Sequence, residues 1–258
     1  MNKIHPASIV SPKAKLGNDV EIGPFSIIYD DVEIGDNTKI GPQVNIYDGA
    51  RISSNVKIFQ GASISNTPQD LKFADEKTYL YIGENTVIRE FATLHRGTIA
   101  TGETKIGENC LLMAYSHVAH DCNLGNNIIL ANAVQLGGHV EIEDWSILGG
   151  GCAIHQFVKV GAHIIASGGT MANADIPPYI MVTGFPARFV GLNSIGLKRR
   201  GFTSDDISAI KDAYHLFYNS GLNMLAAREK IAEKYSGHPI VNRILQFMND
   251  STRTIIRK

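Results

Sequence analysis

A repeat of six residues constrains this chain more than any other feature. Stepping by six places a branched aliphatic residue at every position from Ile4 to Ile64, and again in the same phase from Ile82 to Leu94 and from Ile106 to Val160. A second, usually small residue follows four positions later, and glycine often comes directly after the aliphatic one. Such hexapeptides predict one short strand each, coiled into a parallel β-helix with the aliphatic side chain inside.

Three hexads make one triangular coil of 18 residues, so the register from residue 4 to about 171 predicts roughly nine coils. Two segments break the repeat, at 65–81 (SNTPQDLKFADEKTYLY) and at 99–105 (IATGETK). We expect both to project from the prism, and segments that leave a regular scaffold usually carry function.

The repeat fades after Pro177-Pro178, and the C-terminal part has helical periodicity. The sequence therefore predicts a β-helix domain over 1–190 and a helical domain over 191–258. Within the second, Ser204 is expected to cap one helix, Asn223 another that reaches Tyr235, and residues 240–249 form a third.

Composition excludes several classes of protein. The 24 Lys and Arg residues nearly balance the 25 Asp and Glu residues, which argues against a nucleic-acid partner. Neither a secretory signal nor an apolar stretch of membrane-spanning length is recognisable, so we expect a cytoplasmic protein without stable membrane insertion. Cys110, Cys122 and Cys152 all occupy the small inward position, which predicts buried packing residues.

The stretch SHVAHDCNLG, residues 116–125, sets two histidines three apart inside the repeats. Residues 18 apart should lie on adjacent coils about 4.8 Å apart, so the hexads beginning at Val118, Leu136 and Ile154 share one face. Their outward residues form three short columns: Ala119, Gly137 and His155; His120, Gly138 and Gln156; and Asp121, His139 and Phe157. Glycine at 138 would leave space beside His120, and His117 sits at the corner before the face.

Residue types alone leave three interpretations of this cluster open. In the first, His120 is a general base oriented by Asp121, and the amide of Gly138 stabilises an oxyanion during acyl transfer. In the second, histidines including His117 bind zinc, as in hexapeptide-repeat carbonic anhydrases. In the third, these are surface histidines or trimer contacts without chemical importance.

Motifs spread over the whole chain favour the first interpretation. SHVAHDC resembles the UDP-N-acetylglucosamine O-acyltransferase family of lipid A biosynthesis, and so do TPQDLKF (67–73), TLHRGT (93–98), LGGHVEI (136–142), AIHQF (153–157), DIPPY (175–179) and GLKRRGF (196–202). The resemblance implies a left-handed prism and a homotrimer with active sites between adjacent prisms. It also implies transfer, without metal or cofactor, of an (R)-3-hydroxyacyl group from acyl carrier protein to the 3-position of UDP-N-acetylglucosamine.

The resemblance also implies site residues. His120, Asp121 and Gly138 are expected to be catalytic, and substrate contacts are expected from Gln69, Asp70, Lys72, His117, His139, His155, Gln156, Asn193, Arg199 and Arg200. Gly168 is expected to leave the acyl groove open at the position that sets chain length, which predicts a long acyl chain. His95 is placed on another face, where a trimer contact is equally compatible, and His163 is expected to be structural.

Ile195 stands where the family often has an acidic residue, so the family's contacts to the uridine or the sugar do not carry over to this position. Two alternative functions are considered. One is transfer to the 3-amine of a diamino sugar with the same base, and the other is that of a zinc enzyme similar to carbonic anhydrase.

Overall fold

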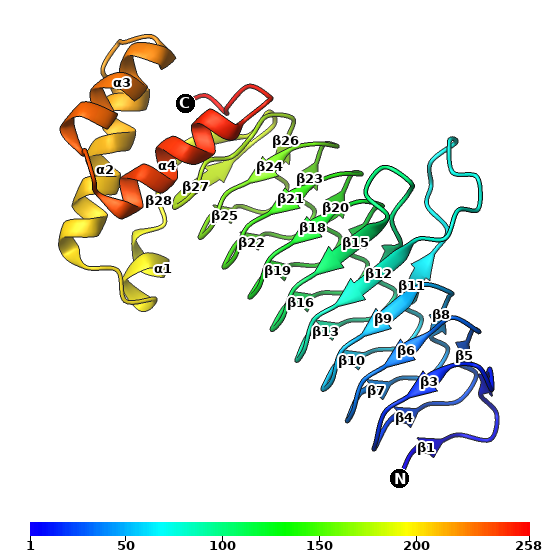
Figure 1. Cartoon of the computed structure of the whole chain (residues 1–258). Helices are drawn as coiled ribbons and strands as arrows, with labels where there is room; N and C mark the ends of the chain where they lie inside the picture. The colour runs from blue at the N-terminus through cyan, green and yellow to red at the C-terminus, as the bar shows by residue number, and fades with distance from the viewer.

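The chain folds as a left-handed parallel β-helix with helices packed at one end, in a computed structural model that describes residues 1–258 (Figure 1). Three parallel sheets form the sides of the prism, and each coil contributes one short strand to each sheet. The first sheet contains, in spatial order, β1 (Lys3–Ile4), β4 (Glu21–Ile22), β7 (Lys39–Ile40), β10 (Lys57–Ile58), β13 (Val87–Ile88), β16 (Leu111–Leu112), β19 (Ile129–Leu130), β22 (Ile147–Leu148), β25 (Ile165–Ala166), β27 (Ile180–Thr183) and the antiparallel β28 (Arg188–Leu192).

The other two sheets follow the same rule. The second contains β2 (Ile9–Val10), β5 (Ile27–Ile28), β8 (Asn45–Ile46), β11 (Ser63–Asn66), β14 (Thr93–His95), β17 (His117–Val118), β20 (Gln135–Leu136), β23 (Ala153–Ile154) and β26 (Met171–Ala172). The third contains β3 (Lys15–Leu16), β6 (Glu33–Ile34), β9 (Ala50–Ile52), β12 (Tyr79–Ile82), β15 (Glu103–Ile106), β18 (Asn123–Leu124), β21 (Glu141–Ile142) and β24 (Lys159–Val160).

The repeated aliphatic residues build the core as the sequence predicts. In the second sheet Ile64, Leu94 and Val118 pair in register on successive coils, and each is fully buried. The three cysteines are buried among them, and burial raises the pKa of Cys110 to about 11 and that of Cys122 to about 12. These thiols stay protonated at neutral pH, which confirms their packing role.

Both predicted excursions leave the prism at the corner between the second and third sheets, where they stand out as the two long loops of Figure 1. The first is shorter than the sequence indicated, because β11 extends to Asn66 and β12 already begins at Tyr79, and the second is shifted towards the N-terminus, because β14 ends at His95 and β15 begins at Glu103. Both loops therefore rise from one corner of the prism.

Four helices follow the prism: α1 (Ser194–Arg199), α2 (Ser204–Asn219), α3 (Met224–Lys234) and α4 (Pro239–Asp250). Asn223 caps α3 as predicted, but the cap of α2 is Thr203 and not Ser204, because Thr203 forms a reciprocal capping box with Asp206. None of the helices is both long and apolar enough to cross a membrane.

The end of the chain returns to the prism, which the sequence did not predict. Ile255 forms a parallel bridge with Asp175, and Arg257 forms one with Arg188. The last coil is therefore covered by the C-terminal segment as well as by the helices.

Candidate active site

The predicted histidine cluster forms at the corner between the second and third sheets. Strands β17, β20 and β23 pair in register, with Val118 opposite Leu136 and Leu136 opposite Ile154. The corner residues Asp121, His139 and Phe157, which follow these strands, all have positive φ, between 59° and 65°. The predicted columns of outward residues are confirmed, because the same backbone turn repeats on three coils and stacks equivalent side chains.

His120 and Asp121 form a hydrogen-bonded dyad at this corner. His120 Nδ1 lies 2.7 Å from Asp121 Oδ2, and the Asp121 side chain is 0% exposed while that of His120 is 14% exposed. A carboxylate can only accept, so Nδ1 carries the proton and Nε2 keeps its lone pair. When the ring is neutral, Nε2 is therefore the nitrogen that can take a proton from a bound group.

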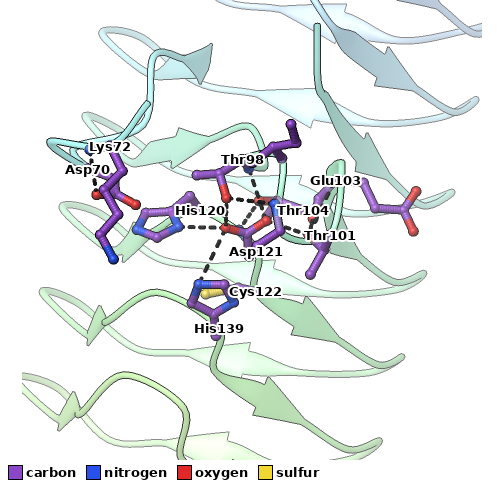
Figure 2. A network of polar contacts seen from close by, with 12 residues as sticks. Asp70, Lys72, Thr98, Thr101, Glu103, Thr104, His120, Asp121, Cys122 and His139 are labelled. Atoms are coloured by element: carbon purple, nitrogen blue, oxygen red, sulfur yellow. Dashed lines mark hydrogen bonds and ion pairs between the residues drawn. The ribbon is translucent and has the colours of Figure 1, made fainter. Parts of the chain in front are cut away.

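Asp121 is surrounded by hydrogen-bond donors (Figure 2). Its carboxylate accepts from the Thr98 N–H at 2.9 Å, from the Thr98 hydroxyl at 2.8 Å, and from the Thr101 hydroxyl. Burial opposes ionisation of Asp121, but bonds from Thr101, His120 and Thr98 outweigh it and hold the pKa below its usual value. Sequence reasoning missed these threonines, although it marked the segment 99–105 that carries Thr101 as functional.

Gly138 lies against His120, as expected for two residues of the same column. A Cβ on Gly138 would come within 2.6 Å of His120 Cε1, so only glycine leaves room for this ring position. The Gly138 N–H donates no hydrogen bond within the chain. It is therefore free to donate to a bound oxygen.

A groove of about 500 Å³ begins at the dyad and follows the second sheet towards the helical end. Its polar part contains Gln69, His117, His120, His155 and Gln156. The groove also has apolar lining, made by Leu136, Ile154, Met171, Ala172 and Phe185. Such a combination fits a ligand with a polar head and an apolar chain.

The neighbouring histidines are held neutral. His139 stacks on Phe157 with ring centroids 4.4 Å apart, and its Nε2 lies 3.6 Å from Asp121 Oδ2. His117 Nδ1 lies 2.7 Å from the Thr93 hydroxyl. Burial lowers the pKa of both histidines, and for His139 it outweighs the nearby charge of Asp121, which acts in the opposite direction. Both can bind a substrate through uncharged hydrogen bonds.

The placement of His95 on another face was wrong. His95 ends β14 in the second sheet and lies next to His117, with ring centroids 5.0 Å apart. The excursion lengthens this coil, so Thr93 pairs with His117 across 24 positions and a step of 18 no longer applies. Burial lowers the pKa of His95 to about 4, so it too is neutral.

The first excursion lies beside the dyad (Figure 2). Gln69 lines the groove, and the segment with Asp70 and Lys72 lies beside His120 in Figure 2. Asp70 accepts the Lys72 N–H at 3.0 Å, and its charge acts on His139. The loop thus adds a partly buried acid, Asp70, and an exposed lysine, Lys72, beside the dyad.

Three expected substrate residues lie at a different corner, between the third and first sheets. Asn193 is buried, caps α1 and donates to the His163 carbonyl at 2.8 Å. The Arg200 guanidinium stacks over Trp145 at 5.0 Å, next to Arg199 at the end of α1. Within one chain these residues do not join His120.

His163 and Gly168 also lie away from the dyad. His163 packs between Trp145, Tyr179 and Phe202, and burial lowers its pKa to about 4, in keeping with a structural role. Gly168 is exposed at the corner between the first and second sheets, before β26, whose Met171 and Ala172 line the groove.

Three side chains of the site could hold a metal ion. Ligand atoms of His120, Asp121 and His139 lie within 4.8 Å of one another. The sequence interpretation considered histidines alone, including His117, whereas this set contains the carboxylate of Asp121 and does not contain His117.

Comparisons with known proteins agree over the whole chain. Residues 175–256 match the family described as UDP-N-acetylglucosamine O-acyltransferase, domain 2, and residues 13–48 and 103–138 match the bacterial transferase hexapeptide family. The acyl-[acyl-carrier-protein]–UDP-N-acetylglucosamine O-acyltransferase of Thiobacillus denitrificans is 51% identical over 100% of both chains.

Solved structures give the same picture. The UDP-N-acetylglucosamine acyltransferase of Francisella novicida has a TM-score of 0.96 and 39% identity, covering 99% of this chain and 94% of that one. The Bacteroides fragilis UDP-N-acetylglucosamine acyltransferase has a TM-score of 0.96 and 43% identity, covering 98% of this chain and 99% of that one.

Proposed function

The chain belongs to the UDP-N-acetylglucosamine O-acyltransferase family, and from this premise we propose that it transfers an acyl group from acyl carrier protein to UDP-N-acetylglucosamine. This is the first step of lipid A biosynthesis. The observation that carries the proposal is the dyad of His120 and Asp121 at the polar end of a groove with apolar lining.

The geometry supports a general-base mechanism on a (R)-3-hydroxyacyl thioester. His120 Nε2 takes the proton of the sugar 3-hydroxyl as its oxygen bonds to the thioester carbonyl carbon. The free Gly138 N–H stabilises the oxyanion of the tetrahedral intermediate. Collapse breaks the carbon–sulfur bond, and the imidazolium returns the proton to the departing thiolate.

Other site residues are proposed to bind rather than to react. Gln69, Asp70, Lys72, His117, His139, His155 and Gln156 surround the dyad and would contact the nucleotide sugar or the acyl chain. No cofactor is needed for this chemistry, and a cytoplasmic location is expected.

A homotrimer would bring the remaining residues to the site. Phe25, Phe91 and Tyr115 line one corner of the prism and are 46–66% exposed, and Phe91 stacks on Tyr115 at 5.3 Å. Exposed aromatic columns are typical of contact surfaces. In such a trimer Asn193, Arg199 and Arg200 of a neighbouring copy would reach the dyad, and the two arginines would also suit an acidic carrier protein.

A mass spectrum of the nucleotide-sugar product tests the proposal. The purified protein, with EDTA, would be incubated with UDP-N-acetylglucosamine, its 3-amino analogue and (R)-3-hydroxyacyl carrier proteins of graded chain length. We expect one dominant product, acylated on the 3-hydroxyl. A product only from the amino analogue would move the nucleophile to an amine.

The same experiment addresses the metal-binding interpretation. His120, Asp121 and His139 could hold zinc, so a chain inactive with both sugars and active towards carbon dioxide after addition of zinc would overturn acyl transfer.

The length of the preferred acyl chain should depend on the residue at position 168. A Cβ there would meet only the backbone of Gly150, at 3.3 Å, so Gly168→Met can be accommodated and would project a long side chain near β26. We expect the variant to prefer a shorter acyl chain than the wild type, measured by competition between the graded donors. Ser167→Met, one residue earlier on the exposed corner, is the control. An unchanged preference in Gly168→Met would place the end of the acyl groove elsewhere.

A further inference from the structure

Asp121 is hydrogen-bonded to three threonines on or next to the second excursion. Thr98 donates both its N–H and its hydroxyl to the carboxylate, and the Thr101 hydroxyl reaches Oδ1. The Asp121 N–H in turn donates to Thr104 Oγ1 at 2.8 Å. Figure 2 shows these threonines on one side of Asp121, with His120 and His139 on the others.

These contacts join two parts of the chain that are distant in sequence. Thr98 and Thr101 lie 23 and 20 positions before Asp121, on the loop between β14 and β15. The loop therefore gives Asp121 its buried, fully hydrogen-bonded environment.

We propose that Thr98 and Thr101 are positioning residues, whose hydroxyls keep Asp121 ionised and hold its carboxylate against Nδ1 of His120. A buried carboxyl group is neutral unless donors compensate for the loss of water. A protonated Asp121 would not hold the Nδ1–H tautomer of His120, and Nε2 would no longer be fixed as the acceptor. The inference rests on the proposed function, in which His120 Nε2 is the base.

Other charged groups near Asp121 do not supply this effect. Lys105 on β15 is paired with Glu103, and Lys159 on β24 lies 3.5 Å from Glu141 on β21. His139 faces Asp121 from the next coil, where burial lowers its pKa, and Asp70 of the first excursion acts on His139. The nearby lysines are thus paired with acids, and the two hydroxyls stabilise the anion together with the Thr98 N–H and His120.

The same hydroxyls also stabilise their own loop. Thr98 Oγ1 accepts the Ala100 N–H at 3.2 Å, and Thr101 Oγ1 accepts the Glu103 N–H at 3.3 Å. Loss of activity alone would therefore not separate positioning from loop stability. The decisive readouts are the pH profile and rescue by serine, which keeps the hydroxyl.

The test compares Thr98→Val/Thr101→Val, which removes both hydroxyls at nearly constant volume, with Thr98→Ser/Thr101→Ser. In the valine variant we expect kcat to fall about 10-fold with little change in KM, the scale of one or two hydrogen bonds to a charged group. With fewer donors the carboxylate becomes more basic, so the dyad keeps its proton to higher pH. The acid limb of the kcat/KM profile should shift to higher pH by about one unit. The serine variant should restore both kcat and the position of the acid limb.

Thr38→Val is the matched control. The Thr38 hydroxyl is also buried and bonded to backbone, with Ser53 O at 3.1 Å, but it lies several coils away from Asp121. The control should lower the thermal midpoint and leave the pH profile unchanged. If the double variant does not fold, Thr101→Val alone replaces it in the same measurements, because Thr101 is exposed.

Nitrogen-15 NMR titration of His120 without substrate separates this inference from the proposed function. In the valine variant the apparent pKa of the His120–Asp121 pair, followed at the His120 ring nitrogens, should rise relative to wild type, whatever reaction the protein catalyses. A wild type without acyltransferase activity would reject the proposed function and leave this readout intact. An unchanged His120 titration and an unchanged acid limb, or failure of serine to restore them, would overturn the positioning role.

Discussion

Replacing His120 with alanine should lower turnover by about 10²-fold or more, the scale expected for loss of a general base. His120 is part-exposed at a corner of the prism and contributes nothing to the aliphatic core. The variant should therefore fold and bind the nucleotide sugar nearly as well as wild type. Steady-state kinetics with a saturating acyl donor would measure the change in kcat.

His5→Ala is the control for a histidine in the same fold but outside the site, since His5 is exposed on the first coil. It should retain full turnover. If folded His120→Ala also kept wild-type kcat, the base would have to be another group, and His139 on the adjacent coil would be the next candidate.

The repeat made the prism and the site corner predictable because a parallel β-helix converts sequence distance directly into spatial distance. One coil is 18 residues long, so spacing alone places Gly138 beside His120 and Phe157 beside His139. This mapping fails wherever a coil carries an insertion. His95 was misplaced for that reason, because the loop between β14 and β15 changes the step from 18 to 24.

Loops and caps depended on interactions that spacing does not encode. The threonines around Asp121 come together through the conformation of the excursion, and no periodic pattern marks them. Helix α1 is six residues long and is fixed by Asn193, whose side chain caps it and bonds to the prism at the same time. The role of Asn193 as a substrate contact stays a prediction that depends on a neighbouring copy.

Replacing Gly138 with alanine should reduce turnover by at least about 10-fold with little loss of stability. The added Cβ would approach His120 Cε1 at 2.6 Å, and its nearest neighbours are all atoms of the His120 ring. Relief of the clash requires rotation of His120, which breaks its bond to Asp121 and moves Nε2 away from the substrate oxygen. The backbone has no comparable clash, so the coil should remain intact.

Gly150→Ala separates this steric effect from the general cost of a methyl group at a prism corner. A Cβ on Gly150 would meet only Asn132 O, at an ordinary 3.4 Å, and its φ is not in the left-handed region. The control should keep its turnover and thermal midpoint. For Gly138→Ala, we expect a lower kcat, an altered His120 titration and a nearly unchanged midpoint. A fully active Gly138→Ala would mean that catalysis tolerates a displaced ring, and the close contact between Gly138 and His120 would then have no catalytic meaning.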